Sequence, residues 1–166
     1  LPPGANRRRD PALVPLSQDH RHALGQALRL RDAAAGPAEG AAAVAKAFLD
    51  HWRSAMQGHF ADEEDVLFPA LEGADSEGVA RLRAEHVEIA DLVARLAAAL
   101  DVGEDPREPM AEIGWLVHDH VRYEERALFE GAQARLSADA LAGVGRALAA
   151  HRSARGLAPG CPTRTA

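Results

Sequence analysis

Residues 59–68 read His59-Phe60-Ala61-Asp62-Glu63-Glu64-Asp65-Val66-Leu67-Phe68, and residues 120–129 read His120-Val121-Arg122-Tyr123-Glu124-Glu125-Arg126-Ala127-Leu128-Phe129. Both stretches have the form His-x-x-x-Glu-Glu-x-x-Leu-Phe. Residues four apart lie on one face of a helix, so each copy directs an imidazole and a carboxylate the same way. Such a pair is costly to bury unless something binds both groups, and a metal ion is a common partner for this combination.

The composition favours a single helical domain. The 166 residues suffice for a substantial core. Apolar residues make up 47% of the chain and aromatic residues only 4%, so alanine and leucine, which favour helices, dominate the apolar content. The formal net charge of −6 argues against a general nucleic-acid binder, and the single cysteine, Cys161, excludes an internal disulfide framework.

We expect no membrane partner, because we find no apolar run long enough to span a bilayer and no recognisable signal peptide. The default compartment is therefore cytoplasmic. The sequence begins at Leu1 rather than Met, so a trimmed N-terminus could hide a targeting segment.

Breaks containing glycine, proline or short polar residues occur at 36–40, 72–76 and 101–109. They separate four amphipathic helices expected from about residue 15 to the first break and over about 41–70, 77–100 and 110–134. A weaker fifth helix, from Ser137 to about His151, would lean on the bundle or on a second subunit, so a homodimer is possible. We predict an all-α, up-down-up-down antiparallel four-helix bundle over 13–152 with a short fifth C-terminal helix, a flexible N-terminal arm over 1–12 and a disordered tail over 153–166.

Residue numbers predict where the core histidines lie along the bundle. Two residues of an antiparallel helix pair lie at the same height when their numbers average to the middle of the connecting break. The averages are 39.5 for His20 and His59, 72.5 for His59 and His86, and 103 for His86 and His120, and each falls in a break. These four histidines should therefore share one layer, with Glu63 and Glu124 one turn away.

A layer of four histidines and two carboxylates predicts metal ligands, because protein donors alone would hardly satisfy it. The alternative is a metal-free polar network that fixes helix register. Six ligands suggest two ions that share the carboxylates and keep open positions, and nitrogen and oxygen ligation suits iron or manganese, with zinc possible. Open positions on a redox metal would bind O2, peroxide or NO.

Several neighbouring residues have more than one possible role. Asp19, Glu85 and Asp119 each precede a predicted ligand and could accept the far ring N–H of a histidine on the next helix, or simply be solvated. Glu64 and Glu125 could be alternative ligands, supporting groups or surface charges. Tyr123 could reach the site or be an ordinary half-buried tyrosine. We expect Trp52 and Trp115 to be core residues, and the remaining histidines to be non-ligands: His22, His51, His118 and His151.

These motifs resemble the hemerythrin-like, or HHE cation-binding, family over roughly residues 16–134. The matching pieces are Asp19-His20, His59-x-x-x-Glu63 with Leu67-Phe68-Pro69, Glu85-His86, and His120-x-x-x-Glu124 with Leu128-Phe129. The resemblance implies a non-haem di-iron centre in which His20 and His59 bind one iron and His86 and His120 the other. It also implies that Glu63, Glu124 and a water-derived oxo or hydroxo group bridge the ions.

Two departures from the oxygen-carrying hemerythrins bear on function. Those proteins have a further histidine four residues after the one on the third helix, where this chain has Ala90. They also have His-x-x-x-x-Asp on the fourth helix, where this chain has His120-x-x-x-Glu124. We therefore expect iron or oxygen sensing, or an enzyme consuming peroxide or NO, rather than simple reversible O2 carriage. A metal-free structural bundle is the third hypothesis.

Overall fold

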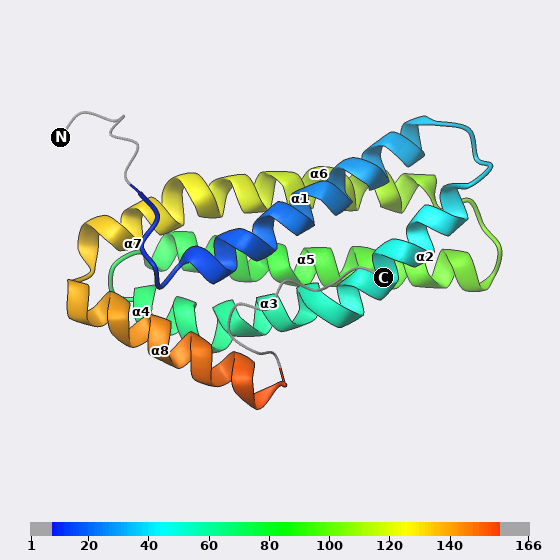
Figure 1. Ribbon diagram of the computed structural model, residues 1–166. Helices are drawn as coiled ribbons and strands as arrows, with labels where there is room; N and C mark the ends of the chain where they lie inside the picture. Colours follow the sequence, from blue (N-terminus) through cyan, green and yellow to red (C-terminus); the bar gives the residue numbers. More distant parts are fainter. Residues whose placement is uncertain (1–7, 157–166) are drawn as a thin grey trace.

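The structure is a computed structural model that describes residues 8–156 (Figure 1). The described residues form five helical rods and contain no strand. The rods comprise α1 (Val14–Ala35); α2 (Ala41–His51), η1 (Trp52–Met56), α3 (Gln57–Asp62), η2 (Glu63–Leu67) and α4 (Phe68–Leu71); α5 (Ser76–Asp101); α6 (Arg107–Tyr123), η3 (Glu124–Leu128) and α7 (Phe129–Arg135); and α8 (Ala138–Ala154).

The turns between the first four rods fall in the three breaks predicted from glycine, proline and polar residues. The first and third turns lie at one end of the molecule and the second at the other (Figure 1). Gly40 and Gly103 adopt positive φ angles of 85° and 72°, which favour glycine. Asp75 ends the second turn by accepting a hydrogen bond from the backbone N–H of Gly78, which caps α5.

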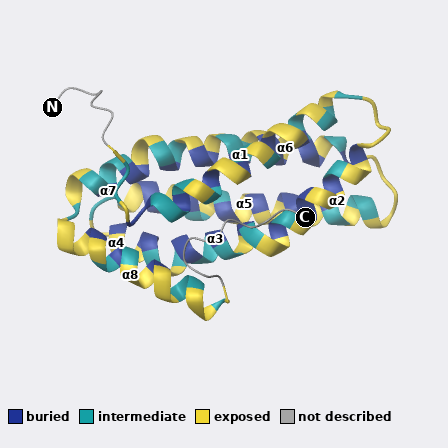
Figure 2. Cartoon of the chain, in the orientation of Figure 1, coloured by how far each residue is buried: buried dark blue, intermediate teal, exposed yellow. Residues whose placement is uncertain are grey.

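Two apolar clusters fill the interior, one on each side of the polar layer. On α1, His20 separates Leu16 of one cluster from Ala23 of the other. His59, His86 and His120 separate members of the same two clusters along the other three rods. Figure 2 shows the buried positions on the inward sides of the helices. The layer is therefore closed above and below by hydrocarbon.

Three short π-helical segments interrupt the second and fourth rods. The segments η2 and η3 begin at Glu63 and Glu124, the glutamates of the two repeated motifs. The backbone N–H of Phe68 donates to the carbonyl of Glu63, and that of Phe129 donates to the carbonyl of Glu124. Such wide turns are often found at functional sites. The predicted helices thus have about the expected extent, but the second and the fourth are not continuous α-helices.

The terminal segments are more ordered than predicted. The flexible arm expected over 1–12 does not include residues 8–12, because Arg9 is bound to Glu125 and Gln133 and Ala12 is buried. The disordered tail expected from residue 153 is helical through Ala154, and Arg152 in its last turn and Arg155 just after it form ion pairs with the bundle. Residues 1–7 and 157–166, with Cys161, lie outside the described residues.

The fifth helix, α8, packs on the bundle. It contacts α3 and η2, and its apolar stripe of Leu141, Val144 and Leu148 is buried (Figure 1). None of the described helices is both long and apolar enough to cross a membrane.

The two tryptophans differ. Trp52 is a core residue, as predicted. The prediction for Trp115 was wrong, since it is 54% exposed and lies beneath the guanidinium of Arg31, 3.4 Å from the ring centroid. A cation–π contact can keep an indole at the surface, where amphipathic spacing alone would bury it.

Gly114 permits the close approach of α6 to α1. A Cβ at this position would lie 2.8 Å from the carbonyl oxygen of Ala27 and 2.6 Å from Cγ of Arg31. We expect Gly114→Ala to lower the free energy of unfolding by about 1–3 kcal/mol, because the backbone of α1 must shift. Gly25→Ala is the control: a Cβ there meets nothing within 4 Å, so the higher helix propensity of alanine should stabilise the protein. Chemical denaturation measures both, and equal effects would contradict the close-packing argument.

Candidate metal centre

The six predicted ligands lie together in one buried layer. His20 comes from α1, His59 from α3, His86 from α5 and His120 from α6, and the glutamates come from η2 and η3. Glu63 and Glu124 are 0% exposed, and none of these four histidines is more than 7% exposed. The layer therefore joins four different rods around two carboxylates.

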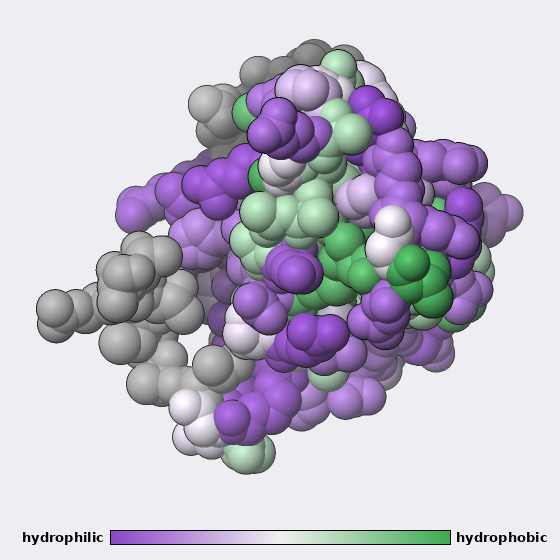
Figure 3. Space-filling view, turned by 90° about the vertical axis from the view of Figure 1, so that its right-hand side faces the viewer, coloured by the Kyte–Doolittle hydropathy of each residue, from purple (hydrophilic) through white to green (hydrophobic). Residues whose placement is uncertain are grey.

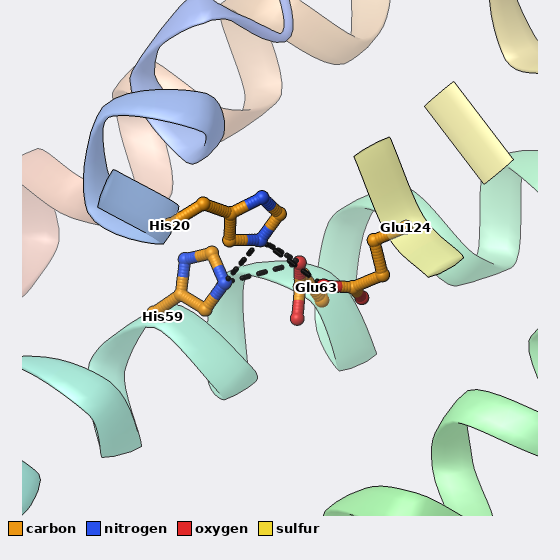
Figure 4. Close-up of side chains that lie close together, drawn as sticks. All are labelled: His20, His59, Glu63 and Glu124. Atoms are coloured by element: carbon orange, nitrogen blue, oxygen red, sulfur yellow. Dashed lines mark hydrogen bonds and ion pairs between the residues drawn. The ribbon is translucent and has the colours of Figure 1, made fainter. Parts of the chain in front are cut away.

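Figure 4 shows the first half of the layer, where the side chains of His20, His59, Glu63 and Glu124 converge. The Nε2 atoms of His20 and His59 lie 3.1 Å apart. His59 Nε2 is 3.2 Å from Oε1 of Glu63, and His20 Nε2 is 3.0 Å from Oε2 of Glu124. Two imidazole nitrogens and two carboxylates thus face a common point.

The second half uses the same two glutamates. His86 Nε2 is 3.2 Å from Oε2 of Glu63, and His120 Nε2 is 3.4 Å from Oε2 of Glu124. Each histidine pair, taken with both glutamates, forms a group whose ligand atoms all lie within 4.8 Å of one another. The glutamates therefore stand between two pairs of histidines, which is the grouping that the family resemblance implies.

The layer contains polar atoms that the described residues do not satisfy. Both carboxylate oxygens of Glu63 and of Glu124, and Nε2 of His86 and His120, are buried without a hydrogen-bond partner. The short distances to neighbouring nitrogens lack the alignment that a hydrogen bond requires. Buried polar atoms are rarely left in this state, because each forfeits its hydration. Cations between the two halves would satisfy all of these atoms, so the donor set fits metal ions.

A second set of carboxylates surrounds the layer and orients the imidazoles. The Nδ1 atom of each histidine lies 2.7–3.2 Å from a carboxylate oxygen on another rod. The pairs are Asp19 with His59, Glu64 with His86, Glu85 with His120, and Glu125 with His20. Each rod thus supplies a carboxylate to the histidine of the next rod, and the fourth rod supplies one to the histidine of the first. A carboxylate on Nδ1 fixes the tautomer and turns Nε2 inward.

These contacts decide between the readings left open by the sequence. Asp19 and Glu85 accept from the histidine of the neighbouring helix, and Glu64 and Glu125 have the same supporting role. Asp119 is exposed and lies beside His118. Tyr123 is half-buried beneath the guanidinium of Arg81, 3.9 Å from its ring centroid.

The other four histidines lie outside the two ligand groups. His22 is exposed. His151 pairs with Asp62, whose carboxylate is buried and also binds Arg152 of α8 and Arg155, which follows α8. Sequence reasoning missed Asp62. Its position three residues after His59, on the flank of the core stripe, was the available signal.

Aromatic rings enclose the imidazoles. Phe60 stacks on His86 with a centroid distance of 3.8 Å, and Phe129 stacks on His20 at 5.3 Å. Phe129 belongs to the repeated motif, whereas Phe60 was not singled out from the sequence. The stacked rings restrict imidazole rotation and keep water from the faces of the ligands.

The position that the sequence analysis matched to the further histidine of the oxygen-carrying hemerythrins does not face the layer. Ala90 is exposed, so a side chain there would not face the layer. One turn before His86, Leu82 is fully buried. The buried position of α5 one turn before His86 is therefore occupied by a hydrocarbon side chain and adds no ligand.

Electrostatics couple the imidazoles to the carboxylates. Burial alone would lower the pKa of His59, but Glu63 and Asp19 raise it to about 9. The pKa of His20 is likewise raised against burial by Glu124, Glu125 and Glu63. Burial would raise the pKa of Glu125, but His20 and Ser17 lower it to about 2. Without metal, the layer therefore holds protons that compensate its carboxylates.

This compensation predicts opposite pH dependences for the stability of the metal-free protein and for the extra stability that bound metal adds. The folded-state pKa of His59 is raised, so its stabilisation is complete below about pH 6.5 and is lost as pH rises through about 9. We expect the Tm of chelator-treated protein to fall over this window, because the free energy of unfolding decreases by up to about 3 kcal/mol. Metal binding needs neutral imidazoles, so metal-induced stabilisation should grow over the same window. Thermal unfolding against pH tests this, and a flat curve for the metal-free protein would contradict it.

Comparison with known proteins identifies the family. The sequence model of the hemerythrin HHE cation-binding domain matches residues 13–132. No curated protein and no solved structure matches the chain. The family match spans the four rods that carry the layer, and on this ground the chain belongs to the hemerythrin HHE cation-binding domain family.

Proposed function

We propose that the layer binds two non-haem iron ions and that the protein engages O2, peroxide or NO there, as a binding or sensing module. The supporting observation is the pair of overlapping four-ligand groups that share Glu63 and Glu124 and leave the inward carboxylate oxygens without hydrogen bonds. His20 and His59 would hold one ion, His86 and His120 the other, and the two glutamates would bridge them. The alternating turns support an up-down-up-down order of the four rods around this site (Figure 1).

Iron in this layer would supply redox chemistry and open coordination positions, with manganese or zinc as possible substitutes. The residues of the chain do the rest. Carboxylates on Nδ1 hold each imidazole with Nε2 inward, and the two apolar clusters exclude bulk water from both sides. A small uncharged ligand such as O2 or NO is suited to so enclosed a site.

A redox enzyme that consumes peroxide or NO is the second candidate. It is favoured by the ligand count, since four imidazoles and two shared carboxylates leave positions open on both ions. A metal-free structural layer is disfavoured, because it would bury both carboxylate oxygens of Glu63 and of Glu124 without a hydrogen bond and leave only protonated imidazoles to balance their charge.

Metal content after removal of one ligand tests the site. We expect wild-type protein, reconstituted anaerobically with Fe²⁺, to bind about two ions per chain. His59→Ala should bind one ion or fewer and unfold at lower temperature, because the carboxylates lose a compensating cation. His22→Ala should keep wild-type content, since His22 is exposed. Unchanged metal content in His59→Ala would refute the ligand assignment.

Turnover separates the two candidate functions. With iron-loaded protein, we measure disappearance of peroxide or NO over many equivalents. Consumption limited to about one equivalent per site would support binding or sensing. Sustained consumption that disappears in His59→Ala would establish the enzyme instead.

A further inference from the structure

Each carboxylate of the outer set is itself bound by one arginine. Glu125 pairs with Arg9 at 2.6 Å and Glu85 with Arg81 at 2.7 Å, and Arg152 binds Asp19 as Arg83 binds Glu64. Every imidazole of the layer is therefore the inner end of a chain that runs from histidine through carboxylate to guanidinium. An arginine that fixes a carboxylate also limits the directions from which that carboxylate can hold its imidazole.

The four arginines come from two kinds of segment. Arg81 and Arg83 lie on α5, within the bundle and close to His86. Arg9 precedes α1, and Arg152 lies in the last turn of α8, so both fall outside the family match over residues 13–132. The two terminal arginines serve the same half of the layer, that of His20 and His59.

The terminal arginines are also the better shielded. The side chains of Arg9 and Arg152 are 19% and 15% exposed, against 50% for Arg81 and 38% for Arg83. Ion pairs at exposed positions contribute little, whereas partly buried ones are screened less by water and salt. Removal of a terminal arginine should therefore disturb its carboxylate more than removal of either arginine on α5.

Arg152 is held in place by a second contact. Its Nε lies 2.8 Å from Oδ2 of Asp62, whose carboxylate is buried three residues after His59. Arg155 binds the other oxygen of Asp62 at 2.6 Å and is not among the ion-pair partners of Asp19. Arg152 thus connects α8 to both Asp19 and Asp62, while Arg155, which follows α8, forms its ion pair with Asp62.

We propose that Arg9 and Arg152 are positioning residues for the metal ion held by His20 and His59, acting through Glu125 and Asp19. This inference rests on the proposed two-ion site. It makes the two halves unequal: one depends on arginines from both terminal segments, and the other is completed by arginines of α5.

The test is the rate of iron release to a chromogenic ferrous chelator, measured anaerobically on the full chain loaded with Fe²⁺. We expect Arg152→Gln to release one of its two ions roughly tenfold faster than wild type and the other at the wild-type rate. Arg152→Lys, which keeps the positive charge, should restore part of the difference. Arg9→Gln should accelerate release of the same ion, because Glu125 holds His20.

Arg155→Gln is the matched control, since it removes an Asp62 contact made just after the same helix and leaves Asp19 bound. Both substitutions should lower the Tm of the metal-free protein, but only Arg152→Gln should accelerate release. Equal acceleration by Arg155→Gln would overturn the proposal, because the effect would then follow from weaker packing of α8. If Arg152→Gln does not fold, Asp19→Asn keeps the Asp62 network and should show the same selective release.

Single-site backgrounds identify the ion. In His120→Ala, which should retain the ion of His20 and His59, Arg152→Gln should still accelerate release. In the His59→Ala background, Arg152→Gln should not change the release rate of the remaining ion. Wild-type rates for Arg152→Gln and Asp19→Asn in protein that binds two ions would overturn this inference alone. Failure of wild-type protein to bind iron would overturn the proposed function and this inference with it.

Discussion

Ionisable groups that cannot reach water constrain the whole structure. Glu63 and Glu124 are enclosed among four imidazoles, with apolar clusters above and below. A buried carboxylate must find positive charge or hydrogen bonds, or it destabilises the fold. The carboxylates around Nδ1 and the arginines beyond them extend this compensation outwards to the surface. From the centre of the bundle outwards, carboxylates thus alternate with imidazoles and then arginines. Cations between the inner carboxylates would add the positive charge at the centre.

The repeated motif explains the approximate symmetry of the layer. In each copy the first glutamate faces inward and the second binds the histidine of another rod, so Glu64 supports His86 and Glu125 supports His20. A π-helical segment begins at the first glutamate in both copies. The two remaining histidines receive their carboxylates from the residues that precede His20 and His86, namely Asp19 and Glu85. The Glu-Glu pair of the repeated motif and the acidic residue before His20 or His86 therefore build a closed ring of four histidine–carboxylate pairs.

The two halves of the layer differ in the residues that bind the outer carboxylates. The half of the layer with His20 and His59 is supported by Arg9, before α1, and by Arg152 of α8, whereas the other half relies on arginines of α5. Hydrocarbon and aromatic rings surround both halves. Such an enclosure separates the site from the many exposed charges of the surface. Figure 3 shows one end of the molecule, where purple hydrophilic residues surround a green apolar area.

Sequence alone determined the helices, the breaks and the six residues of the layer, because helical periodicity and loop midpoints depend only on residue spacing. It also supplied the candidates Asp19, Glu64, Glu85 and Glu125, but not which histidine each one holds. Tertiary packing decided those pairings, since they join side chains on different rods. Packing also decided the burial of Asp62, the docking of α8, the contacts of Arg9 and the exposure of Trp115 and Ala90. These features depend on the rotation and proximity of helices distant in sequence, which no local spacing encodes.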